Sequence, residues 1–118
     1  MKGDEVMIHE MKLQDKYYDF IKNGTKRIEL RLHDEKRSLL KLGDTIRFLK
    51  EPELKENFDA KIIGLLSYTS FENLFKDFDI SILADKNMTK EELLNTLQKF
   101  YPKEKQEEYG VLGIRLEI

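Results

Sequence analysis

Residues 24–31 read GTKRIELR, and this stretch decides how the rest of the chain is interpreted. The glycine follows a helical pattern and is a typical stop signal for a helix. From Arg27 to His33 apolar and charged residues alternate, which predicts a strand with one buried and one charged face. The buried face holds Ile28, Leu30 and Leu32, and the charged face holds Arg27, Glu29, Arg31 and His33.

Glu29 and Arg31 lie two residues apart on the charged face of this strand. A carboxylate beside a guanidinium holds it in a fixed orientation, which suits recognition of a phosphate or of a base edge. The alternative is an ordinary surface ion pair that contributes about 0–1 kcal/mol to stability. The spacing alone leaves both interpretations open.

Lys26 lies just after the helix-terminating Gly24 and adds a third charge close in sequence. Strict alternation would place Lys26 on the strand face opposite Glu29. If Lys26, Glu29 and Arg31 line one cleft, the chain must bend at residues 25–27. A glycine at position 24 permits such a bend.

Working outward, hydrophobic periodicity predicts four more strands and three helices. Gly64 interrupts one strand and is expected to mark a bend, and the two Phe- and Leu-rich helices are interpreted as packing elements. In the last strand, alternate residues from Leu112 to Ile118 are expected to face inward. The pattern predicts an α+β fold, a curled, mostly antiparallel sheet of about five strands flanked by short helices. The further strands cover 6–13, 45–50, 59–69 and 109–118, and the helices cover 15–23, 71–77 and a segment between the Thr89–Glu92 capping box and Pro102.

The chain has 118 residues, which suits one domain over residues 1–118, with a flexible N-terminus expected at residues 1–5. The absence of cysteine excludes disulfides, thiolate metal sites and a cysteine nucleophile. The two histidines lack metal-site spacing and no cofactor fingerprint occurs, so neither a metal nor a cofactor is expected. No membrane-length apolar run and no signal-peptide pattern occur, which predicts a cytoplasmic protein without membrane contact.

The charge of the chain is unevenly distributed. The net charge is −2, but residues 22–41 hold seven basic and three acidic residues, so this segment carries +4 and the remainder −6. A local basic stretch on an acidic protein attracts phosphate or another anion. Because 37% of the residues are charged, a chance cluster is the alternative.

The motif resembles a known family. Gly24, Lys26, Glu29 and Arg31 match the G-x-K-x-x-E-x-R signature of the ASCH domain, and the turn at 42–44 and the closing strand around 109–114 are also similar to small bacterial ASCH proteins. The resemblance implies a PUA-like β-barrel with a cleft near the signature, which binds RNA, a nucleotide or a nucleoside. It also implies that Lys26, Glu29 and Arg31 line the cleft and that Gly24 belongs to the ligand-binding residues.

Two further residues are candidates for ligand binding. His33 shares strand parity with Glu29 and Arg31, which places it at the rim of the expected cleft. Tyr68 lies on a strand expected to border the cleft and offers a surface for base stacking.

Whether the chain is an enzyme stays open at this point. One ASCH branch that resembles it comprises amidohydrolases acting on acetylcytidine through a lysine, a threonine and a glutamate. Lys26 matches that lysine, but Glu29 stands at the threonine position and the glutamate position falls near Lys86, beside Asp85. Ribonuclease activity, attributed to other relatives, would use Lys26 and Glu29. A protein-interaction domain that uses its acidic outer surface is the remaining alternative.

Overall fold

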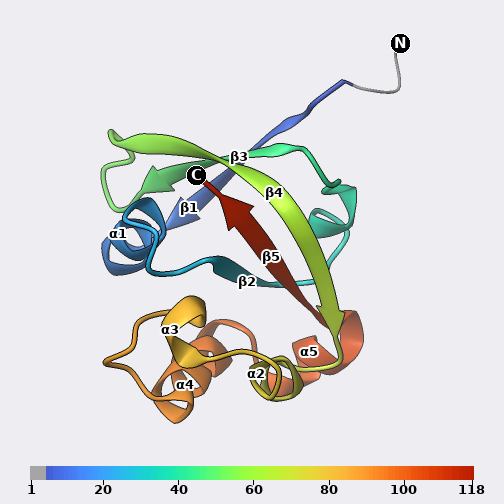
Figure 1. The fold of residues 1–118 in the computed structure, drawn as a ribbon. Helices are drawn as coiled ribbons and strands as arrows, with labels where there is room; N and C mark the ends of the chain where they lie inside the picture. Colours follow the sequence, from blue (N-terminus) through green and yellow to red (C-terminus); the bar gives the residue numbers. More distant parts are fainter. Residues whose placement is uncertain (1–4) are drawn as a thin grey trace.

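The computed structural model describes residues 5–118, so most of the N-terminal segment expected to be flexible lies outside the described residues. One five-stranded sheet organises the chain, with strand order β1-β3-β4-β5-β2 (Figure 1). The β1–β3 pair is parallel and the other three pairs are antiparallel, which confirms the mostly antiparallel α+β prediction. The strands are β1 (Ile8–Leu13), β2 (Ile28–Leu32), β3 (Thr45–Lys50), β4 (Asn57–Tyr68) and β5 (Val111–Glu117).

The sheet curls because β4 is long and bends. Its first half pairs with β3 and its second half with β5, and the register shifts between Ile62 and Gly64. A Cβ at Gly64 would lie 3.0 Å from the Cβ of Arg115, so glycine lets the two strands approach at the bend. The predicted bend at this glycine is therefore confirmed. Figure 1 shows β4 sweeping from the β3 side of the molecule down to the helices.

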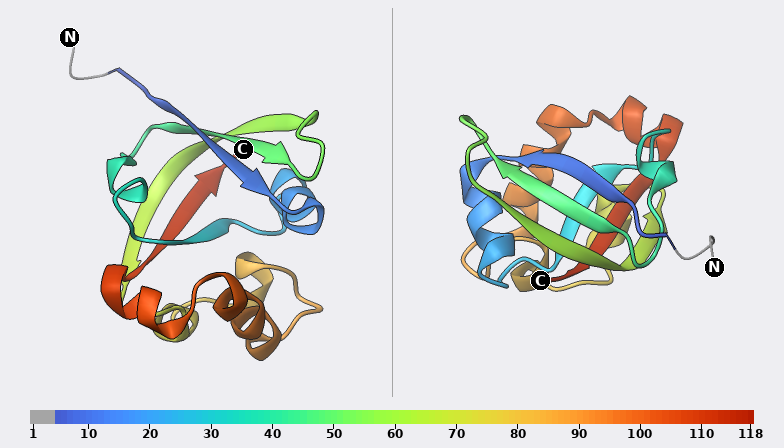
Figure 2. Two further views of the ribbon diagram at one scale, coloured as in Figure 1. Left: turned by 180° about the vertical axis from the view of Figure 1, so that it is seen from behind. Right: turned by 90° about the horizontal axis from the view of Figure 1, so that it is seen from above.

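Within residues 5–118, five α-helices flank the sheet, where three were expected. One helix lies at the end of β1 and β3, and the other four lie together on one side of the sheet (Figures 1 and 2). Two helices were not predicted. The helix at Ile80–Leu83 has only four residues, and the helix at Lys103–Tyr109, with the sequence KEKQEEY, buries only Gln106 and lacks an apolar stripe. The helices are α1 (Asp15–Lys22), α2 (Phe71–Phe75), α3 (Ile80–Leu83), α4 (Lys90–Phe100) and α5 (Lys103–Tyr109), and a 3₁₀ turn, η2, covers Arg37–Leu39.

Two apolar clusters form the core. One fills the curl of the sheet and includes Met11, Tyr18, Ile46 and Phe48. The other lies between β2 and helices α2–α4 and holds Ile28, Leu30 and Leu32, the predicted buried face of β2, together with Phe71, Leu74 and Leu93. The sheet and the helical layer are therefore joined through β2.

One expectation about side-chain burial is wrong, and one polar face is more covered than strand alternation shows. Glu29, on the charged face of β2, is only 5% exposed. Ile118 does not face inward: it is 63% exposed because β5 ends one residue earlier, at Glu117. Alternation along a strand does not show whether another element covers its polar face.

Candidate functional site

The polar face of β2 borders a cavity of about 300 Å³. The sheet order makes β1 and β2 its two edge strands, and the cavity lies where these edges approach each other beneath α4. Side chains from α1, from the loop before β2 and from the segment after α4 complete the wall. The lining includes Lys12 and Leu13 of β1, Lys26, Glu29 and Arg31 around β2, and Leu93, Thr96, Leu97 and Phe100 of α4.

Lys26 reaches the cavity because the chain turns sharply before β2. Gly24 has a φ of +85°, a conformation that other residues seldom adopt. The amide of Lys26 then donates to the carbonyl of Phe20, and the amide of Arg27 donates to that of Ile82. These bonds hold residues 25–27 outside the strand, so strand alternation does not apply to Lys26.

The Lys26 ammonium is buried among three acceptors. Its Nζ donates to the main-chain oxygens of Ile28 at 2.7 Å and Leu83 at 2.6 Å, and lies 3.6 Å from Oε1 of Glu29. Burial lowers the pKa of Lys26 to about 8, against the opposing charge of Glu29. The side chain is thus mostly protonated at neutral pH and links the start of β2 to α3.

Glu29 is shared between two cations. Its Oε2 accepts a hydrogen bond from Nε of Arg31 at 2.8 Å, while Oε1 faces Lys26. Burial alone would raise the pKa of Glu29, but the charges of Arg31 and Lys26 hold it below its ordinary value. Two cations and one anion leave one net positive charge at the floor of the cavity.

Arg31 extends from this buried group to the opposite edge of the sheet. Its Nη2 donates to the main-chain oxygen of Lys12 in β1 at 2.9 Å, and its side chain is 14% exposed. A guanidinium has five N–H donors, of which these two bonds use two. Arg31 therefore keeps donors for a molecule in the cavity.

An aromatic and apolar wall faces these charges. Tyr17 of α1 lies with its ring centroid 5.9 Å from Nζ of Lys26, and Phe100 and Tyr101 close the other side. The sequence interpretation assigned α4 to packing alone and missed its part in the cavity. The missed signal is a stripe at helical spacing that includes a hydroxyl, Leu93, Thr96, Leu97 and Phe100, whose last member is 58% exposed.

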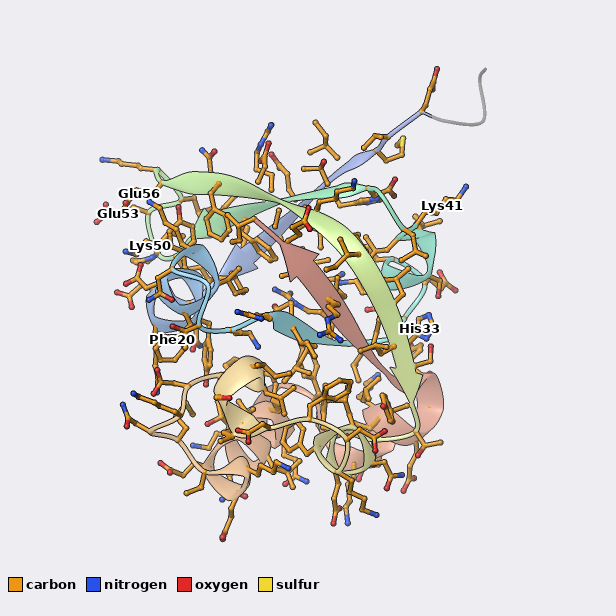
Figure 3. The ribbon with its side chains drawn as sticks, viewed as in Figure 1. Phe20, His33, Lys41, Lys50, Glu53 and Glu56 are labelled. Carbon is orange, nitrogen blue, oxygen red and sulfur yellow. The ribbon has the colours of Figure 1, made fainter. Side chains whose placement is uncertain are left out.

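The other candidate residues do not line this cavity. Gly24 shapes the turn before β2. His33 follows the C-terminal end of β2, and its Nδ1 lies 3.2 Å from Oγ of Ser67. Figure 3 shows His33 on the side of the molecule opposite Phe20. The Tyr68 hydroxyl donates to Asp77. Asp85 caps the turn at Asn87 instead of facing Lys26.

Within residues 5–118, no three histidine, aspartate or glutamate side chains are grouped as metal ligands would be. In the same part of the chain, no helix combines the length and apolar character needed to cross a bilayer.

Comparison with known proteins places these features in context. The sequence model of the ASCH domain matches residues 11–118. The crystal structure of hypothetical protein PH0355 is 36% identical in sequence, with a TM-score of 0.83 over 94% of this chain and 98% of that one. The solution structure of protein PF0455 from Pyrococcus furiosus is 32% identical, with a TM-score of 0.75 over 94% of this chain and 96% of that one.

A more distant structure shares the fold alone. A mutant of ZmASCH from Zymomonas mobilis is 12% identical, with a TM-score of 0.67 over 94% of this chain and 68% of that one. A search of curated proteins finds no match.

Proposed function

The chain belongs to the ASCH domain family, and we propose that it binds RNA by taking a base or nucleotide unit into the cavity between β1, β2 and α4. The family is generally thought to bind RNA. The observation that carries the proposal is the fixed pair of Glu29 and Arg31 at the cavity floor.

This pair offers an acceptor and a donor side by side. Glu29 uses one lone pair of Oε2 for Arg31, and a carboxylate has about four such sites. Arg31 keeps unused N–H donors. A base edge likewise presents donors and acceptors next to each other, so one planar ligand can satisfy both side chains at once.

The wall of the cavity suits a flat ring. Its volume of about 300 Å³ matches the smaller ligand pockets of proteins. Tyr17, Phe100 and Tyr101 offer aromatic faces, and stacking of a base on such a face contributes about 1–3 kcal/mol to binding.

Lys26 has a supporting role in this proposal. Two main-chain oxygens accept hydrogen bonds from its Nζ, and Glu29 lies 3.6 Å away as an ion-pair partner, so Lys26 holds Glu29 in place and adds positive charge. The two hydrogen bonds argue against Lys26 as a nucleophile, because they direct two of its three protons at fixed main-chain acceptors.

The proposal is tested by fluorescence anisotropy with labelled single-stranded RNA. Wild-type protein should bind, and Arg31→Gln should weaken binding at least about tenfold, since a hydrogen bond to a charged group contributes about 1.5–3 kcal/mol. Arg115→Gln, an exposed arginine on β5, is the matched control and should bind like wild type. Equal affinities for the two variants would contradict the proposal.

A second variant guards against misfolding. Phe100→Ala removes a side chain that is 58% exposed, so the fold should persist while RNA affinity falls by about 1–3 kcal/mol. Ile63→Ala, at a 45% exposed position on β4, is its control and should leave the affinity unchanged. Incubation of wild-type protein with acetylcytidine tests the hydrolase alternative, for which we expect no turnover.

A further inference from the structure

A second cavity follows the first along β1. It has a volume of about 450 Å³ and is lined by residues 8–11 of β1 together with Lys36, Arg37 and Arg47. The first cavity begins at the next two residues of the same strand, Lys12 and Leu13. One strand therefore borders both cavities in succession.

The second cavity holds cations without partners. Lys36 is exposed and Arg37 half-buried, and neither forms an ion pair with another residue in the range 5–118. Arg47 differs, since Asp59 accepts two hydrogen bonds from its guanidinium, at 2.8 and 3.0 Å. The one acidic residue in the lining is Glu10. Lys36 and Arg37 therefore bring two positive charges against the one negative charge of Glu10, which leaves the lining with an excess of positive charge.

Arg37 also has an unsatisfied donor. Its Nε is buried and has no hydrogen-bond partner within the described residues. Buried donors are normally paired, so a missing partner here points to an acceptor that comes from outside the chain. Burial and the nearby charge of Arg31 lower the pKa of the Arg37 guanidinium, so an anion beside these two arginines would relieve their repulsion.

We propose that the bound RNA is a single strand that runs along β1, with one base in the first cavity and neighbouring phosphate on Lys36 and Arg37. This inference rests on the proposed function and specifies its ligand as a polynucleotide. Residues 8–13 of β1 extend about 17 Å, at about 3.3 Å per residue. That span exceeds one nucleotide, so a free nucleoside would fill only the first cavity.

The test compares two ligands and a double variant, Lys36→Gln with Arg37→Gln. Fluorescence anisotropy measures the affinity for an RNA strand of about eight nucleotides. This length lies within the range that single-stranded binding folds cover. NMR titration measures the affinity for the corresponding nucleoside. The variant should bind the strand about tenfold more weakly and lower the log–log salt slope by about 1.4, for two phosphate contacts at about 0.7 each. Its affinity for the nucleoside should equal that of wild type.

Two controls keep the test specific. Lys61→Gln with Arg115→Gln removes the same charge from exposed positions on β4 and β5 and should preserve affinity for the strand. Lys36→Glu alone should also bind the strand more weakly than wild type. Because it changes only an exposed side chain, this loss of affinity cannot result from misfolding.

The outcomes separate this inference from the proposed function. If the Lys36 and Arg37 variant binds the strand like wild type while Arg31→Gln does not, the β1 path is wrong and the cavity proposal stands. An equal loss in the control pair would also overturn the path, since it would reflect overall charge. If wild-type protein binds neither ligand, both proposals fail.

Discussion

The guanidinium of Arg31 on β2 donates a hydrogen bond to the main-chain oxygen of Lys12 on β1, at 2.9 Å. These strands are the two edges of the sheet and share no ladder of main-chain hydrogen bonds. An arginine side chain thus joins the edges at one point, and the cavity opens beside it. The residue that is proposed to bind the ligand also shapes the site.

Replacing Arg31 with lysine should fail to preserve binding. An ammonium retains the charge but lacks the planar fork that contacts Glu29 and Lys12 together. We expect Arg31→Lys to bind RNA at least about tenfold more weakly than wild type. Arg115→Lys is the control, and wild-type affinity in Arg31→Lys would show that charge alone suffices.

Removing the charge of Glu29 should destabilise the fold. Glu29→Gln leaves Lys26 and Arg31 without their shared buried counter-charge, which should lower the free energy of unfolding by about 3–5 kcal/mol. Urea unfolding measures this loss. Glu117→Gln is the control, because Glu117 is exposed at the end of β5 and its replacement should change the free energy of unfolding little. A similarly small change in Glu29→Gln would contradict the buried contacts of Glu29 with Lys26 and Arg31.

Lys26 should make stability depend on pH. Its pKa is lowered to about 8 in the folded chain, while an unfolded lysine keeps a value of about 10.4. Between these values the unfolded chain binds more protons, so the free energy of unfolding rises with pH in this window.

The matched comparison is Lys26→Met, which cannot titrate. From about pH 7.5 to about pH 9.5, wild type should gain about 2 kcal/mol relative to this variant. Urea unfolding at constant ionic strength measures the difference. A wild-type curve parallel to that of the variant would show that the lysine titrates normally.

Gly24 should tolerate asparagine better than alanine. The positive φ disfavours any residue with a Cβ, although a Cβ there would meet no atom within 4 Å. Gly24→Ala should therefore cost about 1–2 kcal/mol from backbone strain alone. Gly24→Asn should cost less, because asparagine adopts this conformation more readily. Thermal unfolding ranks the stability of the two variants and wild type. Equal stability of Gly24→Ala and wild type would exclude strain at this turn.

Local patterns predicted most of the sheet. The alternation from Arg27 to His33 located β2, and Gly64 located the bend of β4. The polar helix α5 carried no apolar stripe and escaped prediction. Alternation could not show that α4 covers part of the polar face of β2, because α4 lies about sixty residues later in the chain.

The candidate site was only partly accessible from sequence. The signature pointed to Lys26, Glu29 and Arg31, and the structure brings these three side chains together. Nothing local predicted that main-chain oxygens of Ile28 and Leu83 surround Lys26. Likewise, α4 meets β1 and β2 only in the folded chain, so hydrophobic periodicity could not predict the cavity between them. A cytoplasmic location stays a prediction.

The account depends on a ligand entering the cavity between β1, β2 and α4. The most direct measurement is an NMR titration with short single-stranded RNA that follows the side-chain Nε–H signal of Arg31 and all backbone amides. We predict that the largest shifts occur at this signal and in residues 12–17, 26–31 and 93–101. An unmoved Arg31 signal, with the largest shifts in residues 57–68 of β4, would contradict the account.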